Sequence, residues 1–99
     1  MKFRVSKRAH RDLDSIWRYV ARKSGIETAE KVDSEIHKAV KLLSNFPGMG
    51  HEREETRGKP YRFWKIYSYL IVYRTEGRNL IVVRVVHGAR DLKRIFGKH

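Results

Sequence analysis

The sequence predicts a small α+β domain, in which a helical hairpin packs on a small antiparallel sheet in the order β-α-α-β-β-β with a short C-terminal tail. Two observations predict it. Apolar residues recur at helical spacing through residues 7–45, and three runs rich in Val, Ile, Tyr and Trp follow within residues 61–87. The 99 residues have room for a single domain, residues 1–99, with one hydrophobic core.

The first half of the chain predicts one strand and two helices. Charged and apolar residues alternate over residues 2–6, which is a strand pattern. Ser6 can cap a helix that ends at Ser24 before Gly25, and Thr28 can open a second helix that ends at Asn45. So few residues separate the helices that we expect a tight antiparallel hairpin. The two apolar stripes are Ala9, Leu13, Ile16, Trp17, Val20 and Ala21, then Ala29, Val32, Ile36, Ala39, Val40 and Leu43.

The second half predicts a surface loop and a three-stranded meander. Residues 48–58 contain three glycines and many charges, which favours a loop. Residues 61–66, 69–75 and 80–87 are joined by links short enough for hairpins, and the first strand is expected to join the edge of their sheet. In the tail, residues 89–99, one side of a last helical turn or two would carry Leu92, Ile95 and Phe96.

The composition points to a basic protein of the cytoplasm. The formal net charge is +12, and residues 57–98 hold eleven Lys and Arg against two acidic residues. Such a surface favours a polyanion or an acidic protein as partner. The chain has no cysteine, which excludes disulfides and thiolate zinc sites. Its apolar runs are far shorter than the roughly 20 residues that span a bilayer.

Most enzyme motifs are missing from the sequence. There is no phosphate-binding glycine loop, no Gly-x-Ser-x-Gly motif and no histidine spacing typical of a zinc hydrolase, so we expect no metal and no cofactor. One set of residues could cleave RNA without a metal, because it offers an acid, a base and cations for the phosphate. We favour the simpler alternative, in which the histidine ends a strand and the arginines are solvated. The set is Glu54, Arg62, Arg84 and His87.

The first helix and the sheet offer aromatic residues with two interpretations. Trp17 fits a core position of its helix, which we favour, or the edge of a groove that accepts a partner's helix. The run of aromatic and basic residues over 61–74 would suit base stacking on a cationic sheet, but it suits a half-buried sheet equally well.

Four segments together resemble ParE toxins of the RelE/ParE superfamily. They are RDLDSIWRYV at 11–20, FPGMG at 46–50, YLIVYR at 69–74 and VVHGARDL at 85–92, and the resemblance covers nearly the whole chain. Each segment is weak alone, and their combination is specific.

The resemblance implies the toxin of a type II toxin–antitoxin pair, of the kind associated with plasmid stabilisation. Its partner would be a ParD-like antitoxin and its target DNA gyrase, inhibited by binding. RelE-like relatives with the same fold instead cleave mRNA on the ribosome, and a non-toxic nucleic-acid-binding module is a third reading. The ending Gly-Ala-Arg-Asp-Leu after His87 matches the ParE pattern better.

Two surfaces are assigned from this resemblance. A groove along the helical hairpin would hold the antitoxin, although the same residues could be buried core. The C-terminal tail would contact gyrase, although it could equally be a helix folded back over the sheet. The antitoxin residues are Leu13, Trp17, Tyr19 and Val20, and the gyrase residues are Arg90, Lys93, Arg94, Ile95 and Phe96.

Overall fold

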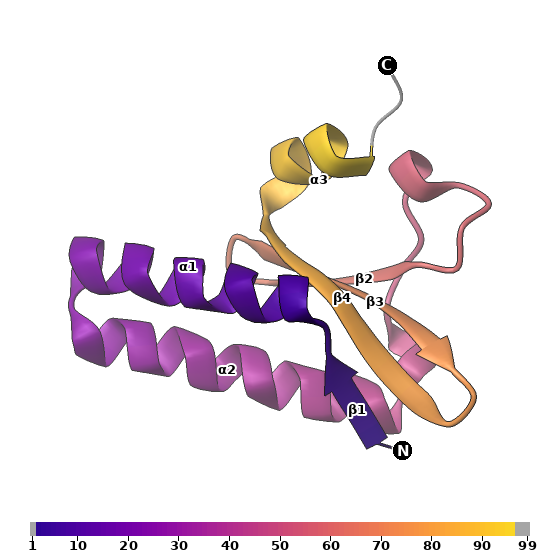
Figure 1. The fold of residues 1–99 in the computed structure, drawn as a ribbon, viewed down its shortest axis with the longest axis horizontal. Helices are drawn as coiled ribbons and strands as arrows, with labels where there is room; N and C mark the ends of the chain where they lie inside the picture. The colour runs from indigo at the N-terminus through magenta and orange to yellow at the C-terminus, as the bar shows by residue number, and fades with distance from the viewer. Residues whose placement is uncertain (1, 97–99) are drawn as a thin grey trace.

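The structure is a computed structural model that describes residues 2–96, with the side chains of residues 89, 90 and 93 outside the description. It confirms the predicted α+β order, and the tail forms a third helix (Figure 1). The elements are β1 (Lys2–Val5), α1 (Lys7–Ser24), α2 (Ile26–Asn45), the 3₁₀ turns η1 (Pro47–Met49) and η2 (Glu54–Thr56), β2 (Arg62–Ile66), β3 (Tyr69–Glu76), β4 (Asn79–His87) and α3 (Gly88–Phe96).

The sheet has the strand order β1-β4-β3-β2, and β1 lies at its edge as expected. The β2–β3 and β3–β4 pairs are antiparallel, whereas β1 pairs with β4 in parallel, Lys2 opposite Asn79. The sheet is therefore mixed: the expected antiparallel meander of β2, β3 and β4 is confirmed, and the edge strand β1 departs from the antiparallel pattern. A parallel pair needs a long crossover, and the helical hairpin with the β2–β3 hairpin supplies it.

The helical hairpin turns at a single residue. Ser6 caps α1 as predicted, since its hydroxyl accepts a hydrogen bond from the Ala9 N–H at 3.0 Å. Gly25 lies between the two helices with φ 96°, a conformation that glycine adopts at little cost. Because one residue reverses the chain, α2 begins at Ile26, two residues before the predicted Thr28.

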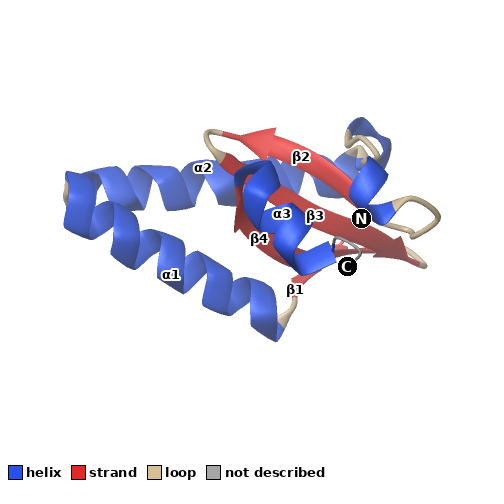
Figure 2. Ribbon diagram, turned by 90° about the horizontal axis from the view of Figure 1, so that it is seen from above, coloured by secondary structure: helices blue, strands red, loops and turns tan. Residues whose placement is uncertain are grey.

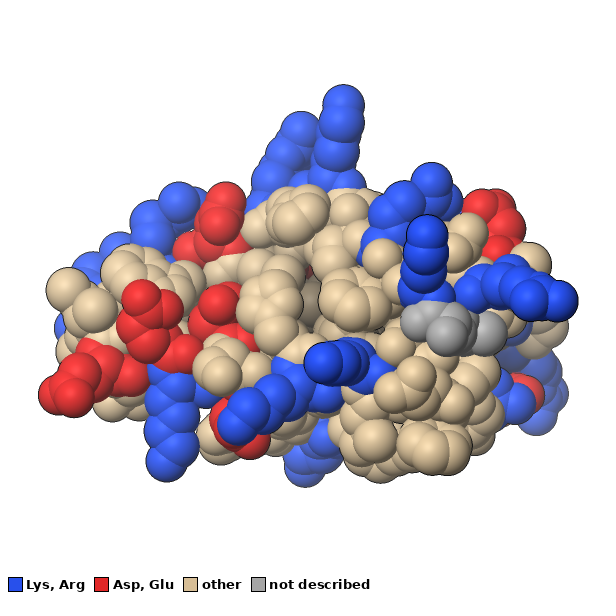
Figure 3. Space-filling model, turned by 90° about the horizontal axis from the view of Figure 1, so that it is seen from below, with Lys and Arg blue, Asp and Glu red and all other residues tan. Residues whose placement is uncertain are grey.

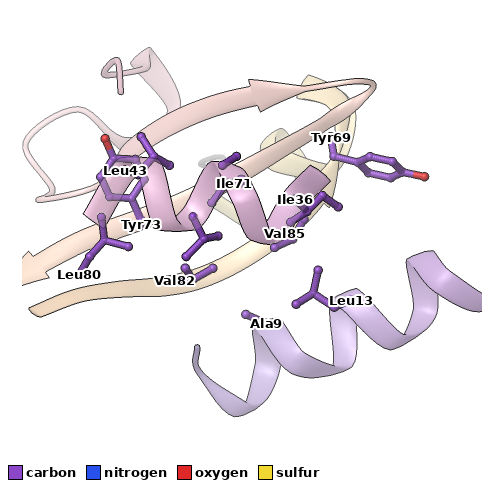
Figure 4. Packing of buried hydrophobic residues seen from close by; sticks show 12 residues of the cluster. Ala9, Leu13, Ile36, Leu43, Tyr69, Ile71, Tyr73, Leu80, Val82 and Val85 are labelled. Carbon is purple, nitrogen blue, oxygen red and sulfur yellow. The ribbon is translucent and has the colours of Figure 1, made fainter. Parts of the chain in front are cut away.

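The helical hairpin covers one face of the sheet and forms the larger core with it (Figure 4). Its buried residues come from α1, α2, β3 and β4. Tyr69 lies at the border of this cluster, with its ring directed away from the other labelled side chains. The buried members are Ala9, Leu13, Ile36, Ala39, Val40, Leu43, Tyr69, Ile71, Tyr73, Leu80, Val82 and Val85.

Helix α3 covers the opposite face (Figure 2). Leu92 of α3 is fully buried there in a second cluster with Phe63, Leu70, Val72 and Val86. The central sheet is thus buried on both sides, which explains why five consecutive residues of β3, 69–73, are all buried.

The loop between α2 and β2 is fastened to the sheet. The Tyr73 hydroxyl accepts a hydrogen bond from the Gly50 N–H at 2.9 Å and donates one to the Pro47 carbonyl at 2.6 Å. Arg62 Nη1 donates to the Gly50 carbonyl at 2.7 Å. Gly50 and Thr56 are buried, so the loop predicted to lie on the surface packs in part against the domain.

Candidate functional site

A cleft of about 400 Å³ opens between α1, the end of β4 and α3. Helix α1 presents Asp12, Ser15, Ile16 and Tyr19 to it, which are three or four positions apart and therefore share one side of the helix. The other walls come from β4 and α3. This cleft is the candidate binding site, since concave surfaces with an apolar floor and a few polar groups are where ligands and partners bind.

Asp12 of α1 holds the wall of the cleft that is formed by β4. Its carboxylate accepts hydrogen bonds from Arg84 Nε at 2.8 Å and Arg84 Nη2 at 3.1 Å, and also from the Val85 N–H at 3.0 Å. The two charged side chains are only 13% and 14% exposed. The positive charge of Arg84 is thus neutralised within the protein, and β4 beyond the end of β1 is held by α1.

Two tyrosines and a histidine gather where β3 and β4 meet the cleft. The Tyr69 ring meets the His87 ring edge to face, with 5.3 Å between the centroids. Burial raises the pKa of Tyr69 above its usual 10.0, and the nearby Tyr19 raises it further. Tyr69 therefore keeps its proton at neutral pH and can donate a hydrogen bond. Tyr19 is 49% exposed and contributes an accessible aromatic surface.

Helix α3 forms the outer wall with Asp91, Arg94 and Ile95. The Arg94 side chain is 77% exposed, and its Nη2 lies 3.6 Å from Asp91 Oδ1. Ile95 and Phe96 are partly buried against the second core cluster, where the Phe96 ring lies 5.4 Å from the Tyr61 ring. The outer wall is therefore apolar toward the sheet and charged toward solvent.

Acidic side chains are concentrated at one end of the molecule, whereas basic side chains are spread widely. On the face seen in Figure 3, acidic side chains gather mainly over the helical hairpin, while Lys and Arg project along most of the surface. Helix α2 carries four acidic residues within its first ten positions. An acidic partner is therefore attracted to the sheet and α3 more than to the far end of the hairpin.

Comparison with known proteins agrees with this fold. A family described as the ParE toxin of the type II toxin–antitoxin system, parDE, matches residues 3–92. The chain belongs to the ParE toxin family. Toxin ParE1 of Caulobacter vibrioides is 32% identical over 95 residues, which cover 96% of this chain and 97% of that protein. Toxin ParE3 of the same organism is 28% identical over 87 residues, covering 88% and 86%.

A solved structure gives the same result for the fold. A chain of the chromosomal ParDE system from P. aeruginosa superposes with a TM-score of 0.76 at 22% identity, covering 89% of this chain and 96% of that one. Sequence and fold thus agree that this is a ParE-type toxin of a type II toxin–antitoxin system.

In this ParE-family chain, the four residues of the alternative nuclease reading do not converge. The Arg84 guanidinium is occupied by Asp12. Glu54 lies on η2, where its exposed carboxylate is 3.2 Å from Arg57 Nη2. These two candidates therefore already have partners of opposite charge.

Arg62 and His87 lie far apart along the sheet. Arg62 is in register with Tyr73, and His87 with Tyr69. Tyr69 and Tyr73 are four residues apart on β3, so about 13 Å separates the two levels along the strand. An acid–base pair acting on one phosphate needs groups within hydrogen-bond reach of the same atoms, and this arrangement does not provide them.

The residues predicted for the antitoxin do not line one groove. Leu13 and Val20 are buried in the domain. Trp17 is half-buried on the seam of the helical hairpin, where its Nε1 donates to Glu30 Oε2 at 3.4 Å. Tyr19 alone of the four lines the cleft. Residues two apart on a helix point in nearly opposite directions, which is why Trp17 and Tyr19 cannot rim the same groove.

The tail predicted to contact gyrase forms α3, which lies over the sheet. Ile95 and Phe96 pack inward, and Arg94 faces solvent. Arg90 and Lys93 belong to α3, but their side chains lie outside the described residues.

The sequence pattern assigned Ile16 only to the apolar stripe of the first helix, and it assigned no binding role to Asp12, Ser15 or Tyr69. The spacing of Asp12, Ser15 and Ile16 on α1 marks a second, more polar side of that helix beside the core stripe. That signal is available in the sequence, but the identity of the facing elements is not.

Among the described residues, no three His, Cys, Asp or Glu side chains form a metal-binding group. None of the helices in residues 2–96 has the length and apolar character needed to span a membrane.

Proposed function

We propose that this ParE-family chain inhibits DNA gyrase by binding it, without breaking a bond through its own side chains. The observation that carries the proposal is the ion pair between Arg84 and Asp12. It neutralises one of the two arginines that the nuclease mechanism would need to bind the phosphate. The separation of Arg62 from His87 along the sheet and the ion pair of Glu54 with Arg57 support the proposal. Action on gyrase requires the chain to be in the cytoplasm.

The solvent-facing side of α3 is the proposed gyrase surface. Arg94 is its exposed cation, and the sequence adds Arg90 and Lys93 to the same helix. Ile95 and Phe96 hold α3 against the sheet and so fix the position of these charges. Positive charge on a rigid helix speeds association with a negatively charged partner.

A ParD-like antitoxin is the proposed partner in the cleft between α1 and α3. Ile16 and Ile95 offer apolar contact there, and Tyr19 offers an exposed ring. A flexible acidic segment that folds onto this basic domain would place apolar side chains in the cleft and carboxylates beside Arg94.

A supercoiling assay tests the gyrase proposal. Purified chain is added to gyrase, relaxed plasmid and ATP, and we expect supercoiling to fall with dose. Arg94→Glu should weaken inhibition at least fivefold, while Arg78→Glu, an equal charge change on the exposed β3–β4 turn, should not. Normal supercoiling at saturating protein contradicts the proposal.

The same preparation is tested on translating ribosomes, because the RelE-like alternative predicts mRNA cleavage there. We expect intact transcripts. Cleavage that disappears in His87→Ala or Arg62→Ala, with gyrase undisturbed, would replace the binding mechanism by the nuclease mechanism.

The antitoxin proposal is tested separately by calorimetric titration with a ParD-like protein encoded beside the gene. Tyr19→Ala should weaken binding about tenfold, as expected for an aromatic anchor at an interface. Ile26→Ala, an exposed apolar residue at the far end of the hairpin, is the matched control. Equal affinities for the two variants would move the antitoxin out of the cleft.

A further inference from the structure

A second cleft, of about 440 Å³, lies where β2 turns into β3, next to the first residue of α3. Figure 1 shows this turn close to the start of α3. Arg53, Lys65, Tyr67 and Ser68 line this cleft alone, whereas Tyr69 and His87 also border the cleft between α1 and α3. Its volume falls in the range of small-ligand sites, roughly 300–1,000 Å³.

The described side chains that line this cleft include cations and no carboxylate. Lys65 is exposed on β2. Arg53 Nε is buried and makes no hydrogen bond, although Glu55 Oε1 lies 3.4 Å away. The Glu55 carboxylate balances the Arg53 charge, but a buried donor without a hydrogen bond is still costly, and an anionic oxygen in the cleft would accept from it. The cleft is therefore suited to an anion.

Tyr67 gives the cleft an aromatic surface in an unusual backbone conformation. Its φ is 55°, and it is the only residue other than glycine with positive φ in the described chain. The side chain is 50% exposed at the tip of the β2–β3 turn. The two-residue turn between β2 and β3 requires this positive φ, which is unfavourable for a bulky side chain and here holds the Tyr67 ring at the exposed tip of the hairpin.

We propose that this cleft binds single-stranded nucleic acid, with a base stacked on Tyr67 and a phosphate between Arg53 and Lys65. A cationic groove beside an exposed ring is the arrangement by which proteins hold single strands without reading their sequence. The net charge of +12 adds a general attraction for the backbone. In a duplex the bases are stacked on each other, so they are not free to pack on Tyr67.

The exposed ring and the charges together favour single-stranded nucleic acid over an acidic peptide. An acidic peptide would use Lys65 and Arg53 but gains little from an exposed aromatic face, whereas every base has a face to stack. The proposal does not rest on gyrase inhibition or on antitoxin binding, because it uses different residues. Binding is expected without cleavage of the strand.

The test is fluorescence anisotropy of the full chain with a labelled oligonucleotide of about twelve thymidines. Tyr67→Ala should weaken binding about tenfold, in line with the loss of one stacked base, and Tyr67→Phe should retain it. Phe46→Ala, which removes an equally exposed ring at the end of α2, is the control and should bind like the parent chain. Lys65→Gln should weaken binding and reduce its salt dependence, unlike Lys38→Gln on α2.

A second measurement reports stacking directly. An oligonucleotide with 2-aminopurine at its centre should lose fluorescence on binding the parent chain and Tyr67→Phe, and much less on binding Tyr67→Ala. Three results would overturn the proposal: a duplex that binds as tightly as the single strand, equal affinities for Tyr67→Ala and Phe46→Ala, or polyglutamate that competes as well as unlabelled oligonucleotide. The last would assign the cleft to an acidic protein.

Discussion

Asp12 and Arg84 stand 72 positions apart in the sequence and form a two-pronged ion pair that ties α1 to β4. The same carboxylate also accepts the backbone N–H of Val85. It thus satisfies three donors at the point where β1 has ended and β4 would otherwise have a free edge. The Asp12 side chain supplies there the hydrogen-bond acceptor that a neighbouring strand would provide.

Replacing Asp12 should therefore be costly. Asp12→Ala leaves a largely buried guanidinium and a backbone N–H without acceptors, and we expect the free energy of unfolding to fall by about 3 kcal/mol. Urea denaturation followed by circular dichroism measures it. Asp14→Ala, an exposed carboxylate on the same helix, is the control and should change stability little. If both variants unfold at the same urea concentration, the ion pair has no stabilising role.

Gly50→Ala should destabilise the protein through a collision with Tyr73. A Cβ at position 50 would overlap the Tyr73 hydroxyl, which already binds the Gly50 N–H. We expect a loss of about 1–3 kcal/mol, typical of overpacking. Gly48→Ala is the matched control, since its Cβ would meet nothing within 4 Å. Equal thermal unfolding temperatures for the two variants would show that the loop moves freely.

Stability should decline in alkaline solution because Tyr73 is buried. Burial raises its pKa above 10.0, although the Gly50 hydrogen bond and Arg62 lower it in part. The folded state thus holds the phenol proton more tightly than the unfolded state does. The stabilisation of the fold that results from this raised pKa of Tyr73 is complete below pH 10. It is lost as the pH rises from there through the folded-state pKa.

Urea midpoints of the parent chain and Tyr73→Phe, compared between pH 8.5 and 11, test this point. The difference between the two proteins should shrink as the pH rises above about 10. A constant difference over this range would mean that the phenol does not titrate differently in the two states. Tyr19→Phe, at an exposed position, controls for loss of a phenol group.

Leu92→Ala should loosen α3. Leu92 is fully buried against Phe63, Leu70 and Val72 on the second face of the sheet. Truncating such a residue costs about 2–5 kcal/mol. Ile95→Ala, at a partly buried position of the same helix, should cost clearly less. Hydrogen exchange of the α3 amides gives the local readout, and unchanged protection in Leu92→Ala would contradict the packing described here.

The helices could be predicted from the sequence because their signals are local. The apolar stripes, the Ser6 cap and Gly25 all act within a few residues of the chain, and α1 begins and ends where they indicate. The start of α2 differs because a single glycine completes the turn. The three strands of the meander were equally readable, since short links force neighbours to pair.

What could not be predicted depends on distant contacts. Nothing in residues 2–5 indicates that they run parallel to β4, because the pattern of a strand carries no information about its partner's direction. Arg84 was read as either catalytic or solvated, and the structure instead pairs it with Asp12 on another element at only 14% exposure. Tyr19 and Trp17 look alike in sequence, and only the position of α3 decides which of them borders a cleft.

The parallel pairing of β1 with β4 also has a consequence for biosynthesis. Residues 2–5 leave the ribosome more than seventy residues before the strand they join, residues 79–82. While the exit tunnel still encloses β4, that edge of the domain must stay open. A nascent copy therefore lacks this pair of strands until β4 has left the tunnel.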